Sequence, residues 1–171
     1  DDPPTRAFPV WEWAIARVRE TYPDAVFLSE AFTRPRVMHR LAKVGFSQSY
    51  PYFTWRNTKQ ELQAYFTELA HGVGRDYFRP NVWPNTPDIL PAALQYGGRP
   101  PFMARVALAA TLSANYGLYG PAYELQEHEA LREGGEEYRN SEKFERRSWD
   151  TARPDSLAEF IGALNCARRD N

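Results

Sequence analysis

Three acidic residues stand where a folded chain could use them for proton transfer or nucleophilic attack. Glu30 directly follows the apolar run AVFLS, Asp88 lies in WPNTPDIL after an extended segment, and Asp1 opens the sequence. A carboxyl group at the end of a strand can act as a general acid or base. It can equally cap a helix or remain solvated in a loop, and spacing alone does not select these three from 22 acidic residues.

The elements that must position these acids alternate between short apolar runs and longer amphipathic runs. Helical spacing of apolar residues predicts helices at 9–22, 36–44, 58–71 and 102–114, and a last helix that opens at 156. Short apolar or extended runs predict strands at 25–29, 46–50 and 78–85, and a strand or turn at 115–120. Strands and helices in this order form parallel βα units, whose functional groups collect at the carboxyl ends of the strands. Glu30 is expected at such an end.

Local signals predict where several of these helices begin and end. Thr58 with Glu61 fits a capping box, and Ser156 with Glu159 fits another. Gly45 is expected as the C-cap of the helix before it, because glycine adopts the left-handed conformation without a steric cost.

Charge and cysteine usage exclude several classes of partner. The 21 basic and 22 acidic residues leave a formal charge of -1, which gives no electrostatic reason to expect nucleic acid or a membrane surface. The one cysteine, Cys166, cannot form an internal disulfide, and we expect a buried thiol in a reducing, cytoplasmic setting. No run approaches the ~20 apolar residues of a membrane span. The charge-rich stretch 121–154 is expected to be a long excursion, either functional or merely solvated.

Several sequence blocks carry a resemblance that runs along nearly the whole chain. They are FLSEAFTRPRVMHRLAKVGFSQSY, YFTWRNTKQEL, DYFRPNVWPNTPDILP, NYGLYGPAYEL and SEKFERRSWD. In this order they resemble the alpha-1,4-glucan:maltose-1-phosphate maltosyltransferases, a branch of the alpha-amylase-like glycoside hydrolases. The resemblance implies an α/β fold over residues 1–171, namely the second half of a (β/α)8 TIM barrel, roughly strands 5 to 8 with their helices.

The resemblance also implies a role for each of the three acids. The opening segment, DDPPTRAFPVWEW, is similar to the segment that follows the fourth barrel strand in that family, which puts Asp1 at the position of the nucleophile. Glu30 falls at the general acid/base, and Asp88 falls at the third carboxylate, which assists binding and the transition state. In a retaining transfer the first two carboxyl groups lie about 5 to 5.5 Å apart. Like charges so close raise the pKa of one of them, which keeps a proton ready for the leaving group.

The implied reaction moves a maltosyl unit from maltose 1-phosphate to the non-reducing end of an alpha-1,4-glucan. Phosphate leaves, a maltosyl ester forms on Asp1, and the 4-hydroxyl of the growing glucan then attacks that ester. No metal or organic cofactor enters this scheme, and His39, His71 and His128 lack the spacing of metal ligands. The implied partners are the donor, the glucan acceptor and a second copy in a homodimeric parent enzyme.

Substrate-binding residues are implied with the same resemblance. Lys143 and Phe144 match a lysine–tyrosine pair that lines the sugar subsites, and Asp2 matches an asparagine beside the nucleophile. Lys143 is expected to bond a sugar hydroxyl, and its alternative is a solvated lysine. Arg56 and Asn57 are expected to organise the loop before the following helix or to cap it.

Two departures from the family pattern weaken the expected chemistry. Asp2 replaces the usual asparagine and adds negative charge beside the nucleophile, and Phe144 replaces the usual tyrosine and loses one hydrogen bond. Four βα units cannot close an eight-stranded barrel, so we expect the isolated chain to be a fragment with exposed edges and little or no activity. Two alternatives stay open: an alpha-amylase-like hydrolase or transglycosylase of ordinary alpha-glucans, and a non-catalytic half-barrel relic.

Overall fold

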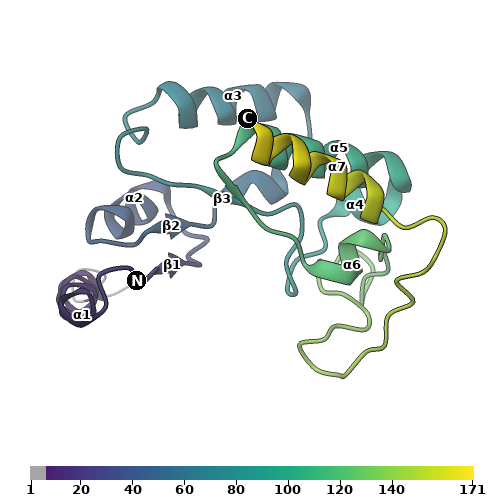
Figure 1. Cartoon of the computed structure of the whole chain (residues 1–171), viewed down its shortest axis with the longest axis horizontal. Coiled ribbons are helices and arrows are strands. Elements are labelled where there is room, and N and C mark those ends of the chain that lie inside the picture. Colours follow the sequence, from purple (N-terminus) through teal and green to yellow (C-terminus); the bar gives the residue numbers. More distant parts are fainter. Residues whose placement is uncertain (1–6) are drawn as a thin grey trace. The chain divides into compact units, whose positions relative to one another are not determined.

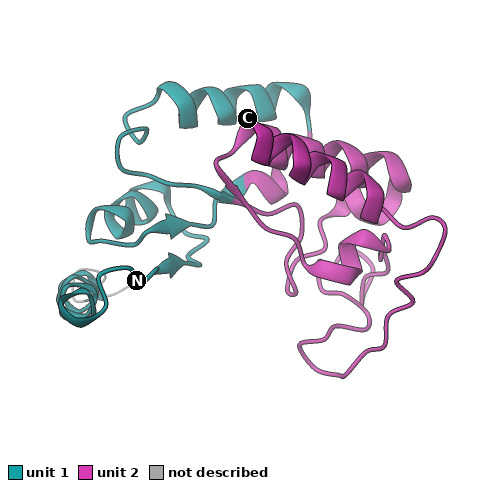
Figure 2. Cartoon of the chain, viewed as in Figure 1, with its two compact units in different colours: residues 1–52, 58–81 teal, residues 53–57, 82–171 magenta. Residues whose placement is uncertain are grey.

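The computed structural model describes residues 7–171, and the chain forms two compact units (Figure 2). Unit 1 comprises residues 1–52 and 58–81, and unit 2 comprises residues 53–57 and 82–171. Helices alternate with short strands along the chain, and parallel pairing is present. The chain is therefore an α/β protein whose elements are compatible with part of a β/α barrel.

Unit 1 is built around a short parallel pair of strands. Strand β1 (Leu28–Ser29) pairs with β2 (Gln48–Ser49), with Leu28 opposite Gln48 and Ser29 opposite Ser49. A parallel bridge from Ser49 to Pro80 adds the next segment on the far side of β2. The side chains of Ser29 and Ser49 are buried and share a hydrogen bond of 2.8 Å, so the pairing also satisfies both hydroxyls. Both strands lie inside the predicted runs but are shorter.

Three helices accompany these strands (Figure 1): α1 (Ala7–Thr21), α2 (Pro35–Lys43) and α3 (Lys59–His71). Helix α2 begins at a proline, whose missing N–H does no harm in a first turn, and buries Met38 and Leu41. Its C-cap is Val44, one residue before the predicted cap. Gly45 then takes a φ of +116°, and a Cβ there would lie 3.0 Å from Ile15 of α1. Gly45 still ends the helix as a glycine is expected to: its N–H donates to the Ala42 carbonyl at 3.3 Å, the Phe46 N–H donates to the Leu41 carbonyl at 3.4 Å, and its missing side chain permits the close approach of α1.

The predicted capping box of α3 is confirmed. The Thr58 hydroxyl accepts a hydrogen bond from the Glu61 N–H at 3.2 Å, and the Glu61 carboxylate accepts one from the Thr58 N–H at 2.9 Å. The apolar stripe of this helix is half-buried, and none of its residues is fully buried. On α1, Val10 and Trp13 are 61% and 69% exposed.

Unit 2 holds the larger core. Its complete elements are α4 (Ala92–Tyr96), α5 (Arg99–Leu112), β4 (Asn115–Tyr116), α6 (Gly120–Glu124) and α7 (Ala158–Asp170). Two short elements are divided between the units: the 3-10 turn η1 (Tyr52–Trp55) belongs to unit 2 from residue 53 on, and strand β3 (Asn81–Val82) belongs to it from residue 82 on. Strand β3 pairs with β4, and the Gly117 N–H donates to the Val82 carbonyl at 3.0 Å. The predicted strand-or-turn at 115–120 is thus a strand that leads directly into α6.

Helix α7 lies along α5 and closes the core of unit 2 (Figure 1). Leu94, Phe102, Val106, Tyr123 and Leu157 are each at most 1% exposed. Phe160, Ile161 and Leu164 of α7 pack against this cluster, as their helical spacing predicts. None of the described helices is both long enough and apolar enough to cross a bilayer.

Two predictions about α7 are wrong. The N-cap is Leu157, whose side chain cannot cap, and the hydroxyl of Ser156 accepts from the Ala158 N–H and donates to Glu124 instead of forming a capping box with Glu159. Cys166 is exposed, because α7 buries only the stripe that faces α5.

A buried arginine on α5 ties the helix to the 53–57 segment within unit 2. Arg105 is 4% exposed, and its guanidinium donates to the carbonyls of Phe53 and Arg56 and to the Asn57 side chain at 2.5, 2.7 and 3.1 Å. It also lies 4.4 Å from the centre of the Phe53 ring. Burial lowers the pKa of Arg105 to about 10. Asn57 thus takes part in organising its loop through its side chain, whereas Arg56 takes part through its backbone carbonyl.

Replacing this arginine should destabilise unit 2. Arg105→Met loses several hydrogen bonds from a charged donor, each worth about 1.5 to 3 kcal/mol, so we expect a loss of about 3 kcal/mol in the free energy of unfolding. Urea denaturation followed by circular dichroism measures it. Arg169→Met, at an exposed arginine near the end of α7, is the control and should leave stability within about 0.5 kcal/mol. Equal midpoints for both variants would contradict the assignment.

Candidate functional site

Glu30 directly follows β1, at the carboxyl end of the parallel pair in unit 1. Tyr50 directly follows β2, and its N–H donates to the Ser29 carbonyl at 3.0 Å, so the two residues sit at the same edge of the sheet. Burial raises the pKa of Tyr50, and the negative charge of Glu30 raises it further. The Glu30 side chain is exposed. Glu30 thus occupies the strand-end position that the βα pattern predicts.

A hydrogen bond steadies the loop that follows Glu30. The Tyr52 hydroxyl donates to the Thr33 carbonyl, and the Thr33 N–H donates to the Ala31 carbonyl at 2.8 Å. The loop is short because Pro35 starts α2 immediately afterwards. Glu30 therefore lies at the start of a short loop that is held by hydrogen bonds.

Asp88 sits in a tight turn of unit 2. Thr86 and Ile89 exchange two backbone hydrogen bonds of 3.1 Å, and the Thr86 hydroxyl accepts from the Asp88 N–H at 3.2 Å. Thr86 is 3% exposed, whereas the Asp88 side chain is 47% exposed. The turn is anchored in the core and directs the carboxylate toward solvent.

Lys143 meets this carboxylate. Its Nζ lies 2.6 Å from Oδ1 of Asp88 and 5.1 Å from the centre of the Phe144 ring. The hydrogen bond that Lys143 donates to Asp88 raises the pKa of Lys143, and the negative charges of Asp88 and Glu137 raise it further. The structure therefore brings together three of the predicted site residues. The lysine, expected to bond a sugar hydroxyl, contacts an acid of the same site.

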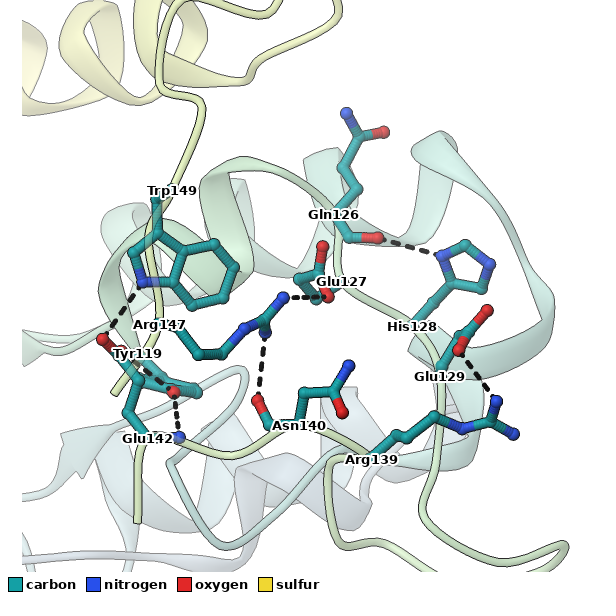
Figure 3. A network of polar contacts seen from close by, with 10 residues as sticks. All are labelled: Tyr119, Gln126, Glu127, His128, Glu129, Arg139, Asn140, Glu142, Arg147 and Trp149. Carbon is teal, nitrogen blue, oxygen red and sulfur yellow. Dashed lines mark hydrogen bonds and ion pairs between the residues drawn. The ribbon is translucent and has the colours of Figure 1, made fainter. Parts of the chain in front are cut away.

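A polar network that sequence reasoning missed includes Glu142, the residue before Lys143 (Figure 3). Glu142 accepts hydrogen bonds from the Tyr119 hydroxyl and the Trp149 ring N–H, both at 3.1 Å. Arg147 lies over the Trp149 ring at 3.9 Å and pairs with Glu127 at 3.2 Å. Of these five residues, all except Glu127 lie in the sequence blocks NYGLYGPAYEL and SEKFERRSWD. Their spacing in the sequence does not show which side chains contact each other.

Asp1 and Asp2 lie outside the described residues. Glu30 belongs to unit 1 and Asp88 to unit 2. The approach of the three acids to one sugar carbon therefore stays a prediction.

Trp83 is held by packing in unit 2. A Cβ at Gly117 would come within 2.3 Å of the Trp83 ring, so the ring lies directly on the backbone after β4. Its carbonyl accepts from the Thr54 hydroxyl at 2.8 Å. The tryptophan and the glycine form one contact that keeps the segment before the Asp88 turn in place.

A hollow of about 670 Å³ opens where α7 begins, lined by Arg99, Arg153 and Phe160 among others. None of the predicted site residues lines it. Arg153 is paired with Asp155 at 2.7 Å, and Arg99 donates to the carbonyls of Asp155 and Ser156. Both arginines of the hollow are thus engaged in contacts within the chain.

Comparison with known proteins shows which of them are similar to this chain in sequence. No family model matches the chain. Proteins named alpha-1,4-glucan:maltose-1-phosphate maltosyltransferase do match: that of Chlorobaculum tepidum is 57% identical over 171 residues, that of Burkholderia pseudomallei is 56% identical over 171, and one of Cereibacter sphaeroides is 54% identical over 169. The chain is a homologue of these maltosyltransferases. All or nearly all of it is matched, while it spans only 25%, 15% and 28% of the three relatives.

The similarity to the maltosyltransferases is thus confirmed, and the chain corresponds to one segment of longer proteins. The matched region includes the residues after β1, the Asp88 turn and the Lys143 segment, because the matches run along the whole chain. The contacts described above therefore belong to a region shared with the maltosyltransferases.

Removing the charge of Glu30 should lower the pKa of Tyr50. In Glu30→Gln the pKa of Tyr50 is expected to fall part of the way toward its ordinary value of 10.0, since the burial that also raises it remains. Carbon-13 NMR of the tyrosine ring during a pH titration measures the shift. Glu20→Gln, at an exposed glutamate paired with Arg17 on α1, is the control and should leave Tyr50 unchanged. An unchanged pKa of Tyr50 in Glu30→Gln would contradict the electrostatic interaction between the two side chains.

Proposed function

We propose that the chain is part of the catalytic domain of a retaining maltosyltransferase, covering roughly strands 5 to 8 of a (β/α)8 barrel with their helices. The parent enzyme transfers maltosyl units from maltose 1-phosphate to the non-reducing end of alpha-1,4-glucans. The end-to-end identity of 50 to 57% with proteins named for this reaction carries the proposal. The successive short strands, with Glu30 directly after the first, support it.

Two carboxyl groups divide the bond changes between them. Asp1 attacks the anomeric carbon, and the bond to phosphate breaks while Glu30 protonates the departing oxygen. The product is a maltosyl ester on Asp1 and free phosphate. The 4-hydroxyl of the glucan then attacks the ester carbon, Glu30 takes back the proton, and Asp1 is released. The exposed position of Glu30 at the end of β1 suits an acid that must reach a bound substrate.

Asp88 acts as the third carboxylate and Lys143 as its partner in the sugar subsite. Their contact of 2.6 Å supports this, because it places the ammonium beside the carboxylate while both groups remain about half exposed and open to a ligand. Phe144 offers an apolar ring beside the lysine, and Asp2 lies next to the nucleophile in sequence. The scheme needs no metal or organic cofactor, and the parent enzyme acts as a homodimer.

The chain by itself should not catalyse the transfer. Four βα units leave the barrel open, so the nucleophile and acid lack the fixed separation that the chemistry needs. Incubation with maltose 1-phosphate and a maltooligosaccharide, followed by a phosphate assay, should show no release above the blank. Turnover comparable to that of a full-length relative would refute this. Products formed from the maltooligosaccharide alone would favour a hydrolase or transglycosylase.

In a full-length enzyme that carries this segment, Glu30 should be indispensable. Glu30→Gln keeps the shape of the side chain but cannot donate a proton, so we expect kcat to fall about 10² to 10⁴-fold. Phosphate release under saturating donor measures it. Glu20→Gln serves as the matched control on α1 and should retain normal turnover. A Glu30→Gln enzyme with unchanged kcat would remove the general acid from the mechanism.

A further inference from the structure

The ion pair between Lys143 and Asp88 cannot hold its own geometry. The two side chains are 46% and 47% exposed. Exposed pairs of this kind contribute little, because two long side chains must be ordered in a medium that screens their charges. Their close contact must therefore be imposed by the backbone segments that carry them.

A buried hydroxyl joins those two segments. The Ser141 side chain accepts a hydrogen bond from the Lys143 N–H at 3.2 Å and donates one to the Pro87 carbonyl at 3.2 Å. Pro87 directly precedes Asp88 in the turn. Ser141 is 2% exposed, so water does not compete for these bonds. One side chain thus contacts the backbone on both sides of the ion pair.

The next residue, Glu142, also anchors this segment (Figure 3). The Glu142 N–H donates to the Tyr119 hydroxyl at 3.2 Å, and its carboxylate accepts from that hydroxyl and from the Trp149 ring N–H. These bonds join residue 142 to Tyr119, the N-cap residue of α6, and to the stretch before α7, and none of them reaches the Asp88 turn. Of the side chains at positions 141 and 142, the Ser141 hydroxyl is the one that bonds to the turn itself, at Pro87.

We propose that Ser141 is a positioning residue whose hydroxyl holds Lys143 against Asp88. It does so because one hydroxyl bonds both the Lys143 N–H and the Pro87 carbonyl, which keeps the two backbone segments close together. Loss of the hydroxyl frees the two segments to separate, and the exposed side chains above them then lose their contact. The importance of this for sugar transfer rests on the proposed function, whereas the positioning itself does not.

The matched control lies in the same unit. The Ser156 hydroxyl also accepts from the N–H two residues ahead, at 3.1 Å from Ala158, and also donates to a distant partner, at 3.0 Å from Glu124. Neither contact involves the predicted site. Ser141→Ala and Ser156→Ala therefore remove the same kind of hydroxyl from the same unit, and only the first should disturb the ion pair.

The Lys143 ammonium reports the outcome in the 171-residue chain. Side-chain NMR during a pH titration should give Lys143 a pKa above its ordinary 10.5 in the unchanged chain and in Ser156→Ala. In Ser141→Ala the pKa of Lys143 should fall toward 10.5, because the Asp88 carboxylate no longer lies close enough to accept its hydrogen bond and to stabilise its charge. An identical Lys143 pKa in Ser141→Ala and the unchanged chain overturns the proposal.

Amide exchange tests the same hydroxyl without any substitution. The Lys143 N–H is expected to exchange with solvent at least tenfold more slowly than an unstructured peptide, since it donates to a buried oxygen. Exchange at the rate of an unstructured peptide overturns the proposal even if Ser141→Ala fails to fold.

A kinetic arm separates the positioning from the proposed function. In a full-length enzyme carrying this segment, Ser141→Ala should lower kcat/KM about 10- to 100-fold, Ser141→Thr should recover most of it, and Ser156→Ala should not change it. If the Lys143 pKa falls while kcat/KM stays unchanged, Ser141 still positions the pair, and the role assigned to Asp88 and Lys143 in transfer is what fails.

Discussion

A single buried amide holds the part of unit 2 that presents the Asp88 turn. The Nδ2 of Asn85 donates to the Tyr138 hydroxyl at 2.8 Å, and its Oδ1 accepts from the Tyr119 N–H at 3.0 Å. Asn85 is fully buried, so an unmade bond at either end would cost about 1 to 3 kcal/mol. The approach to the turn, the two tyrosines and, through them, the segment carrying Lys143 are kept in one arrangement.

The two tyrosines continue this arrangement outward through their hydroxyls: that of Tyr138 accepts from Asn85, and that of Tyr119 donates to Glu142. Burial raises the pKa of both Tyr119 and Tyr138, so their hydroxyls stay protonated throughout the physiological range. Their rings pack edge to face at 5.4 Å, which orients the Tyr119 hydroxyl toward Glu142. The apolar core thus ends in one donor, the Tyr119 hydroxyl, that bonds to a surface segment. This lets an exposed lysine and acid meet reproducibly although their own attraction is weak.

Sequence reasoning succeeded where the decisive contacts are local. The capping box of Thr58 and Glu61 and the strand before Glu30 follow from neighbours within a few residues. The same reasoning failed for Ser156, whose hydroxyl satisfies the criteria of a cap but finds Glu124 instead. It failed for Cys166 because helical periodicity places a residue near an apolar stripe without showing how much of the helix the neighbour covers.

The sequence by itself determined the order of the strands and of the five longer helices, the likeness to the maltosyltransferases and the positions of the candidate acids, but not the short helices α4 and α6. Only the tertiary structure decided that Lys143 pairs with Asp88 and that Ser141 contacts the backbone beneath both. The physical reason is the range of the forces involved. Backbone propensity and capping act between residues a few positions apart, whereas a hydrogen bond between distant segments exists only once the packed core has set the path of the chain.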